Sequence, residues 1–302
     1  MTEKILITGS GLLASELAEK FSNLEVYLTY RKNKVDIKNS IFLDITDKDN
    51  LEKNILKIKP DTIIHTAAIT DLDWCEKNVD ETFKINTEAT INIRKIAEKI
   101  NSKLIFISTD SVFDGKNGRY EEEDELNPIN IYSKSKVLAE KDVQKYDKSL
   151  IVRGTFFGLK NDKKESFFSY LLNELMQKKK ILIPKDKISN GLFVKDFSEI
   201  IAKMSKKNLS GIYHLGSTDF KNNVEFAKQV AEICSFDKEL IEECLFDEIF
   251  DRKKLIAKRP LNTTLNVEKI SKEIKMPTVR EVITSFSKNY KTMVQNEVEA
   301  LE

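Results

Sequence analysis

The chain has 302 residues and a mass of 34.8 kDa, and 40% of its residues are hydrophobic and 33% charged. This composition is ordinary for a globular protein and excludes an intrinsically disordered chain. Lys and Arg number 50 and Asp and Glu 49, so the net charge is only +1. The balance gives no overall attraction to nucleic acid or an anionic membrane. The sequence also contains no run of about 18 apolar residues, the length needed to span a bilayer. We therefore expect neither nucleic acid nor membrane as a partner.

Cysteine and histidine usage indicates a reducing compartment and no metal site. Cys75, Cys234 and Cys244 are odd in number and lack C-x-x-C spacing, which argues against a disulfide framework or structural zinc. His65 and His214 both fall in strand patterns, where a buried histidine bonded to its neighbours is the common case. The N-terminal residues lead into a strand pattern without the features of a signal peptide. These features predict a cytoplasmic protein.

Short apolar strands alternate with helices along the first half of the chain. The predicted strands are Lys4–Thr8, Glu25–Tyr30, Ile41–Leu43, Thr62–His65, Leu104–Ser108 and Leu150–Arg153. The predicted helices are Leu12–Phe21, a helix capped by Asp47 that ends at Ile58, about Glu81–Ile100, and Tyr132–Gln144. Repeated strand–helix–strand units imply parallel pairing with right-handed crossovers. The predicted fold class is α/β, a doubly wound parallel sheet of the Rossmann type.

After Gly154 helical patterns dominate. We expect helices at Phe167–Met176, Val194–Met204 and Val224–Ile233, with short strands at Ile181–Ile183 and Gly211–Leu215. The predicted domains are a dinucleotide-binding domain over residues 1–155, completed by segments within 190–218, and a smaller substrate-binding cap mainly over 156–302.

A glycine turn lies between the first strand and the first helix. Its G-x-G-x-x-A pattern is made by Gly9, Ser10, Gly11, Leu12, Leu13 and Ala14. The first glycine permits a tight turn, the second lets backbone approach a pyrophosphate, and the small alanine allows close helix–strand packing. The helix N-terminus then offers N–H groups to the phosphates. The turn predicts a bound dinucleotide.

The residues at the end of the second strand indicate whether the cofactor is NAD or NADP. An NAD enzyme usually has an acidic residue there for the ribose 2′-hydroxyl, but this strand ends in Thr29, Tyr30, Arg31 and Lys32. Arg31 has the fork of donors that suits a 2′-phosphate. We therefore expect NADP(H) in preference to NAD(H).

Tyr132 and Lys136 share one face of a predicted helix, because a spacing of four residues is about one turn. Thr109 lies at the end of a buried strand, where open α/β sheets place their ligand crevice. A phenol, an ammonium and a hydroxyl gathered there can polarise and protonate a ketone. The ammonium is expected to lower the pKa of Tyr132 from its ordinary value near 10. Hydride must come from a cofactor.

The motif from Ser108 to Gly115, S-T-D-S-V-F-D-G, resembles the extended short-chain dehydrogenase/reductases, and within them enzymes similar to dTDP-4-dehydrorhamnose reductase. An acidic segment at Tyr120–Glu125, Pro128 and the Y-x-x-x-K pair follow in the family's order. The other matching positions are His65–Asp73, Asn86, Arg153, Gly158 and Arg259–Asn262. The resemblance therefore runs from the first strand almost to the C-terminus.

The resemblance implies an NAD(P)H-dependent reductase of a 4-keto-6-deoxy nucleotide sugar. Thr109 would hydrogen-bond the ketone oxygen, Tyr132 would protonate it, and Lys136 would hold the nicotinamide ribose. The implied cofactor contacts are Gly9, Ser10, Gly11, Leu12 and Leu13 at the pyrophosphate, Arg31, Asp44 and Ile45 near the adenosine, and Ala67, Ala68 and Ile107 along the groove. The implied substrate contacts are Thr109, Asp110, Phe156 and Arg259.

Several positions depart from the family's pattern. Ser111 replaces a tyrosine, Phe156 replaces a frequent tryptophan, and Ser189–Gly191 lacks a frequent Pro-Thr. These changes surround the sugar and nucleotide, so base, sugar and stereochemistry are not predicted. Glu16 matches only half of a two-glutamate metal contact found in some relatives, and we predict no metal.

Two other functions fit the same motifs. A nucleotide-sugar epimerase or dehydratase would use this fold with tightly held NAD, and Asp110 is half of a dehydratase's acid–base pair. Some relatives are NADP-binding regulatory subunits of methionine adenosyltransferase that can keep the tyrosine and lysine. A homodimer is compatible with the resemblance, although no apolar stripe demands one.

Overall fold

A computed structural model describes residues 2–32, 34, 37–159 and 167–299. Its centre is a seven-stranded sheet in the order β11-β6-β5-β4-β1-β2-β3, and every pairing in it is parallel. The strands are β1 (Lys4–Thr8), β2 (Glu25–Tyr30), β3 (Ser40–Phe42), β4 (Thr62–His65), β5 (Lys103–Ile107), β6 (Ser149–Gly154) and β11 (Gly211–Leu215). The predicted doubly wound α/β fold is confirmed. The strand order reverses between β1 and β4, which is where such sheets bind ligands.

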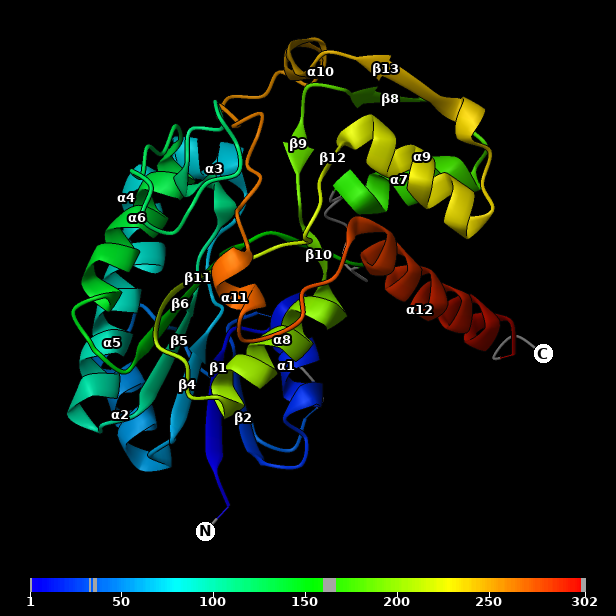
Figure 1. Ribbon diagram of the computed structural model, residues 1–302. Coiled ribbons are helices and arrows are strands. Elements are labelled where there is room, and N and C mark those ends of the chain that lie inside the picture. The colour runs from blue at the N-terminus through cyan, green and yellow to red at the C-terminus, as the bar shows by residue number, and fades with distance from the viewer. Residues whose placement is uncertain (1, 33, 35–36, 160–166, 300–302) are drawn as a thin grey trace.

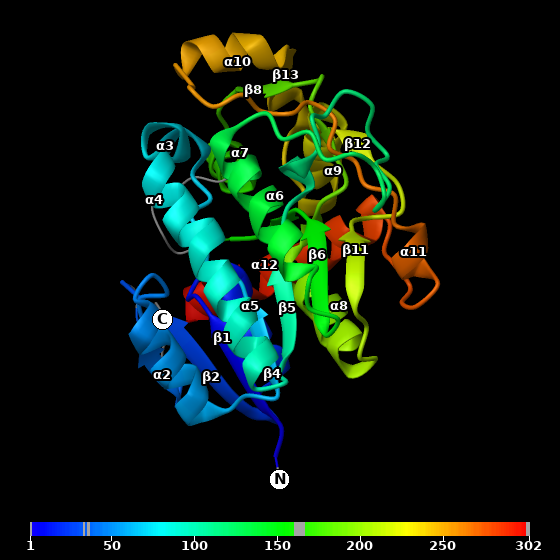
Figure 2. The same ribbon diagram turned by 90° about the vertical axis from the view of Figure 1, so that its left-hand side faces the viewer.

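Helices cover both faces of the sheet (Figures 1 and 2). One face carries α2 (Lys48–Ile58), α5 (Ala89–Lys99) and α6 (Ile131–Val143), and the other carries α1 (Leu12–Lys20) and α8 (Val194–Lys206). The strands are therefore buried on both sides and read as unbroken apolar runs. Two separate cores result, one behind each face.

A lobe of helices and short strands lies beyond the carboxyl ends of the sheet strands (Figure 1). Its helices are α7 (Phe167–Met176), α9 (Asn223–Cys234), α10 (Phe246–Arg252) and α12 (Val279–Glu299). Helix α11 (Glu268–Ser271) instead packs beside β11 at the edge of the large sheet. Its strands form three pairs: β7 (Phe156–Phe157) with β10 (Leu192–Phe193), β9 (Ile188–Ser189) with β12 (Lys221–Asn222), and β8 (Ile181–Pro184) with β13 (Ile241–Cys244). The lobe encloses a cluster of phenylalanine rings, with Phe157 and Phe168 at 4.4 Å and Phe168 and Phe286 at 4.6 Å. The two-residue strands, β13, α10, α11 and α12 were not predicted.

The second strand predicted after Gly154, β11, pairs with β6 at the edge of the large sheet. The sheet is thus completed by a segment that follows part of the lobe in the sequence. The division of the chain into a dinucleotide-binding domain and a cap stays a prediction.

The predicted helix over about Glu81–Ile100 is three segments in the structure. They are α4 (Val79–Phe83), a π-helical turn η1 (Lys84–Glu88) and α5. Inside the π turn, buried Asn86 bonds both backbone groups of Ile69 and donates to Ser135 Oγ at 3.1 Å. An extra helix, α3 (Leu72–Lys77), begins where Asp71 accepts from the backbone N–H of Trp74. Among the helices in the described ranges, none is both long enough and apolar enough to cross a membrane.

Candidate active site

A cavity of about 990 Å³ lies at the carboxyl ends of β1, β4 and β5. It gathers all but one of the residues expected to bind cofactor or substrate. Those that line it are Gly9, Ser10, Gly11, Leu12, Leu13, Arg31, Ile45, Ala67, Ala68, Ile107, Thr109, Asp110, Tyr132, Lys136, Phe156 and Arg259. The exception is Asp44, which does not line the cavity although its neighbour Ile45 does.

The glycine turn is fixed by its neighbours in the sheet. Gly9 has a φ of +101°, and a Cβ there would lie 3.0 Å from Thr66 Oγ1 and 3.1 Å from Ala67 Cα. Its N–H donates to Thr29 Oγ1 at 3.0 Å. Only glycine fits this conformation and this space.

Gly11 begins helix α1 with no side-chain cap and with open space around its Cα. The N–H groups of the first turn therefore lack the usual capping acceptor and lie beside the cavity, which suits a pyrophosphate. The turn is built as a dinucleotide cradle.

Arg31 and Asp44 form an ion pair, with Arg31 Nε 3.0 Å from Asp44 Oδ2. The other oxygen of Asp44 accepts from the N–H and the hydroxyl of Thr46. Both carboxylate oxygens are thus engaged within the protein, which explains why the side chain stays out of the cavity. The terminal nitrogens of Arg31 remain as donors on a half-exposed side chain.

Helix α6 carries Tyr132 and Lys136, and its first turn is tied to two other parts of the chain. Asn130 caps it by accepting from the N–H of Ser133 at 2.8 Å and also donates to the carbonyl of Lys258. The N–H of Ile131 donates to Glu76 of α3 at 2.8 Å. Because these bonds tie the start of α6 to α3 and to the segment around Lys258, Tyr132 is held in a defined place.

The Lys136 ammonium is buried and donates to the carbonyl of Ile107 at 2.8 Å, with its Nζ 4.0 Å from the centre of the Phe106 ring. Burial lowers the pKa of Lys136 to about 7. Burial also raises the pKa of Tyr132, outweighing the opposite effect of the Thr109 side chain. The expectation that Lys136 lowers the pKa of Tyr132 is wrong, since desolvation is the largest influence and the ammonium is bonded to Ile107.

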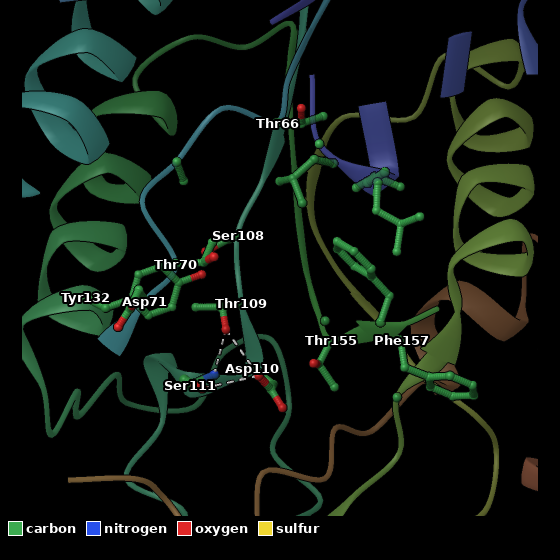
Figure 3. A pocket seen from close by; sticks show the side chains of 18 of the residues that line it. Thr66, Thr70, Asp71, Ser108, Thr109, Asp110, Ser111, Tyr132, Thr155 and Phe157 are labelled. Atoms are coloured by element: carbon green, nitrogen blue, oxygen red, sulfur yellow. Dashed lines mark hydrogen bonds between the residues drawn. The ribbon is translucent and has the colours of Figure 1, made fainter. Parts of the chain in front are cut away.

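Thr109 and Asp110 form a small network on the cavity wall (Figure 3). Thr109 Oγ1 donates to Asp110 Oδ1 at 3.1 Å and accepts from the N–H of Ser111. The other oxygen of Asp110 accepts from Thr263 Oγ1 at 2.6 Å, and burial raises the pKa of this carboxyl. The Thr109 proton is directed at Asp110, so the hydroxyl must turn before it can donate to a ketone oxygen.

The wall opposite Tyr132 carries Thr155 and Phe157, which belong to the lobe side of the cavity (Figure 3). Phe156, predicted to contact the substrate, lines the cavity and packs against Phe197 at 5.1 Å between ring centres. Arg259 pairs with Asp73 of α3 at 3.1 Å. This pair joins the C-terminal part of the chain to α3, where the N–H groups of Ile256 and Ala257 also donate to Asp73.

Lys187 is a lining residue that the sequence analysis missed. Its Nζ donates to the carbonyl of Pro260 at 2.6 Å, and burial lowers its pKa to about 8. In the sequence it is one lysine among many, and only its place after the β8 strand pattern could have marked it.

The two histidines are structural, as predicted. His65 contacts Thr8 Oγ1 at 2.6 Å and Thr90 Oγ1 at 2.9 Å, and burial lowers its pKa to about 3. His214 contacts the carbonyl of Tyr120 at 3.0 Å in the same buried, neutral state. Within the described part of the chain, no group of three metal-ligating side chains is found.

Comparisons with known proteins agree with this geometry. The chain is similar to the dTDP-4-dehydrorhamnose reductase of Aggregatibacter actinomycetemcomitans, with 29% identity over 238 residues that cover 76% of this chain and 80% of that protein. It is also similar to methionine adenosyltransferase 2 subunit beta of Rattus norvegicus, with 25% identity over 281 residues, 89% of this chain and 82% of that protein.

Among solved structures, a dTDP-4-dehydrorhamnose reductase from Bacillus anthracis in complex with NADP matches with a TM-score of 0.84 and 27% identity, covering 95% of this chain and 99% of that one. The family described as RmlD substrate binding domain matches residues 3–292. The resemblance to the extended short-chain dehydrogenase/reductases is thus confirmed, and the chain belongs to the RmlD substrate binding domain family.

Proposed function

We propose that this protein is an NADPH-dependent reductase of the 4-keto group of a nucleotide-linked 6-deoxysugar. One observation carries the proposal: a single cavity joins a dinucleotide cradle at Gly9 and Gly11 to the Thr109, Tyr132 and Lys136 set. The relatives named dTDP-4-dehydrorhamnose reductase support this chemistry.

The residues present suit NADPH. The uncapped first turn of α1 fits the pyrophosphate, and Arg31 and Lys32 offer positive charge at the end of β2 for a 2′-phosphate. The structural neighbour in complex with NADP supports the same cofactor. When bound, NADPH supplies the hydride. Lys136, at the inner end of the cradle, would hold the nicotinamide ribose.

Tyr132 is the proton donor in this proposal. Because burial raises its pKa, the phenol stays protonated at neutral pH and can give its proton to the oxygen of a reacting ketone. Thr109 becomes a second donor to the ketone oxygen when it turns from Asp110.

The charged and aromatic lining of the cavity supports an anionic, nucleotide-bearing substrate. Lys187, Lys221 and Arg259 line the cavity, and Phe156 offers an aromatic surface. Cationic side chains suit a diphosphate, and an aromatic ring suits a base or sugar face. We propose a contact with the substrate for each of these four residues.

Two broader expectations stay predictions. The protein is proposed to act in the cytoplasm, and it is proposed to form a homodimer. The molar mass of the purified protein, measured by light scattering after size exclusion, tests the second. A monomer at working concentration would contradict it.

The function is tested by following NADPH oxidation with a panel of 4-keto-6-deoxy nucleotide sugars. We expect turnover in the wild type and a loss of about 100-fold or more in Tyr132→Phe, which lacks the donated proton. The matched control is Tyr146→Phe, because Tyr146 is a buried tyrosine that bonds Ser102 away from the cavity. Equal losses in both variants would contradict the role of Tyr132.

The alternatives give different results in the same assay. An epimerase or dehydratase would convert a nucleotide sugar with no net NADPH oxidation. A regulatory subunit, like the methionine adenosyltransferase 2 subunit beta relatives, would bind NADPH without turnover and co-purify with a catalytic partner.

A further inference from the structure

A buried ion pair lies on the same face of α6 as Tyr132 and Lys136, one turn further along the helix. The side chains of Arg153 and Glu140 are only 2% and 0% exposed, and Arg153 Nη2 lies 2.8 Å from Glu140 Oε2. Arg153 Nε contacts both carboxylate oxygens, at 3.1 and 3.2 Å. Arg153 Nη1 donates to the carbonyl of Glu122 at 3.0 Å and contacts His214 Nε2 at 3.4 Å. The guanidinium is therefore held from three sides.

Stability alone does not explain such a pair. Removing two charges from water costs about as much as their attraction returns, and apolar side chains of equal volume often serve as well. What the carboxylate touches is more informative. Glu140 Oε1 also accepts a hydrogen bond from Ser108 Oγ. Ser108 ends β5, lines the cavity and precedes Thr109.

Glu140 also acts on Lys136. The two residues lie one turn apart on α6, and the Lys136 ammonium is bonded to Ile107, the residue before Ser108. Burial lowers the pKa of Lys136, and the Glu140 charge acts against that by favouring the ammonium. The carboxylate thus reaches both the end of β5 and the lysine.

Other charged or titratable groups surround α6, but their partners hold them elsewhere. Glu76 of α3 is bonded to the first turn of α6, and Arg94 of α5 is paired with Asp142 in its last turn. His65 of β4 is neutral, and Asp110 of η2 (Asp110–Val112) is bonded to Thr109 and Thr263.

The π turn η1 meets α6 through uncharged Asn86 and Thr87, which bond Ser135. Glu140 is therefore the acidic group that acts on Lys136.

We propose that Glu140 is a positioning residue of this active site. Its carboxylate, oriented by Arg153, supplies the counter-charge of the Lys136 ammonium. The same carboxylate fixes Ser108, and with it Thr109, against the helix that carries Tyr132. The proposal rests on the proposed function for its effect on turnover, but its effect on cofactor binding is independent of turnover.

The experiment measures NADPH affinity by fluorescence, and also kcat where turnover occurs. Both are measured from about pH 5 to about pH 9, a range that brackets the pKa of Lys136. We expect wild-type affinity to fall as pH rises through the pKa of Lys136. In Glu140→Gln that fall should move to lower pH by about one unit, because a counter-charge is lost. Ser108→Ala should leave the fall in place and lower kcat alone.

The matched control is Asp142→Asn. Asp142 lies on α6 like Glu140 but outside the cavity, and its Oδ1 is paired with Arg94 Nη2 of α5 at 2.7 Å. The substitution should leave the pH dependence unchanged. If Glu140→Gln binds NADPH with the wild-type pH dependence, the proposal is wrong.

Should Glu140→Gln not fold, the double variant Glu140→Gln/Arg153→Met leaves no unpaired buried charge and must still move the fall to lower pH, by less than the single variant because a positive charge is removed as well. A wild type that binds NADPH but reduces none of the panel would overturn the proposed reductase. The binding titration would still test Glu140 in that case.

Discussion

The two walls of the cavity are built from different interactions. On the sheet side, buried polar groups hold one another in fixed directions: Lys136 to Ile107, Glu140 to Arg153 and Ser108, Asp110 to Thr263. On the lobe side, phenylalanine rings pack in several orientations between short strands. Hydrogen bonds fix angles, whereas apolar packing tolerates changes that conserve volume. The sheet side is thus suited to chemistry that demands fixed geometry, and the lobe side to substrate differences among relatives.

The sharpest test of this contrast is the buried pair. Arg153→Met leaves Glu140 as an unpaired buried carboxylate, and we expect the free energy of unfolding to fall by about 3 to 5 kcal/mol. Denaturant unfolding measures it. If the free energy of unfolding falls by less than about 1 kcal/mol, as it does for exposed ion pairs, the bonds of Glu140 to Arg153 and Ser108 do not fix the sheet side of the cavity.

Lys136 gives a test with a pH signature. Its pKa is about 7 in the folded protein and near 10.4 when unfolded, so the unfolded state binds more protons between these values. The free energy of unfolding should therefore rise with pH from about 7 to about 10, and the rise should be smaller in Lys136→Met, where other buried lysines such as Lys187 still contribute. Thermal unfolding across that range measures the difference. We also expect Lys136→Met to lose about 100-fold or more in turnover.

The lobe side should tolerate more. Phe286 is 1% exposed and touches Phe168, Phe193 and Tyr290. Phe286→Leu keeps an apolar side chain, and we expect a loss of only about 1 to 1.5 kcal/mol. A loss equal to that of Arg153→Met would remove the contrast between the walls.

The smallest effect is expected at the surface. Lys20 and Glu199 join α1 to α8 at 2.8 Å, but both side chains are partly exposed. Lys20→Ala should change the free energy of unfolding by about 0.5 kcal/mol or less, since water competes for such pairs. Raising the salt concentration should reduce even this difference.

The sheet was predictable because its strands are buried on both faces and appear as apolar runs between turns. The cavity was predictable because Gly9 and Thr109 follow strands whose carboxyl ends meet at one edge. The π-helical turn around Asn86 could not be predicted from the sequence. It depends on hydrogen bonds to Ile69 and Ser135, which lie far away in the sequence.

The electrostatics of the site could be predicted least. The sequence places Lys136 one turn from Tyr132, but the direction of its ammonium depends on the Ile107 carbonyl and on burial. Asp44 was expected beside the adenine, and its pairing with Arg31 depends on how β2 and β3 lie together. Glu140 stands four residues after Lys136 on α6, a spacing that could have marked it, but its partner Arg153 lies on the strand β6.

The late arrival of β11 has a consequence for synthesis. Until residues 211–215 leave the ribosome, β6 has no partner along one edge, although every residue of β6 is buried in the finished protein. An unpaired apolar edge is a template for pairing with other chains. Nascent chains that stall between β6 and β11 should therefore be the most prone to aggregate and the most dependent on chaperones.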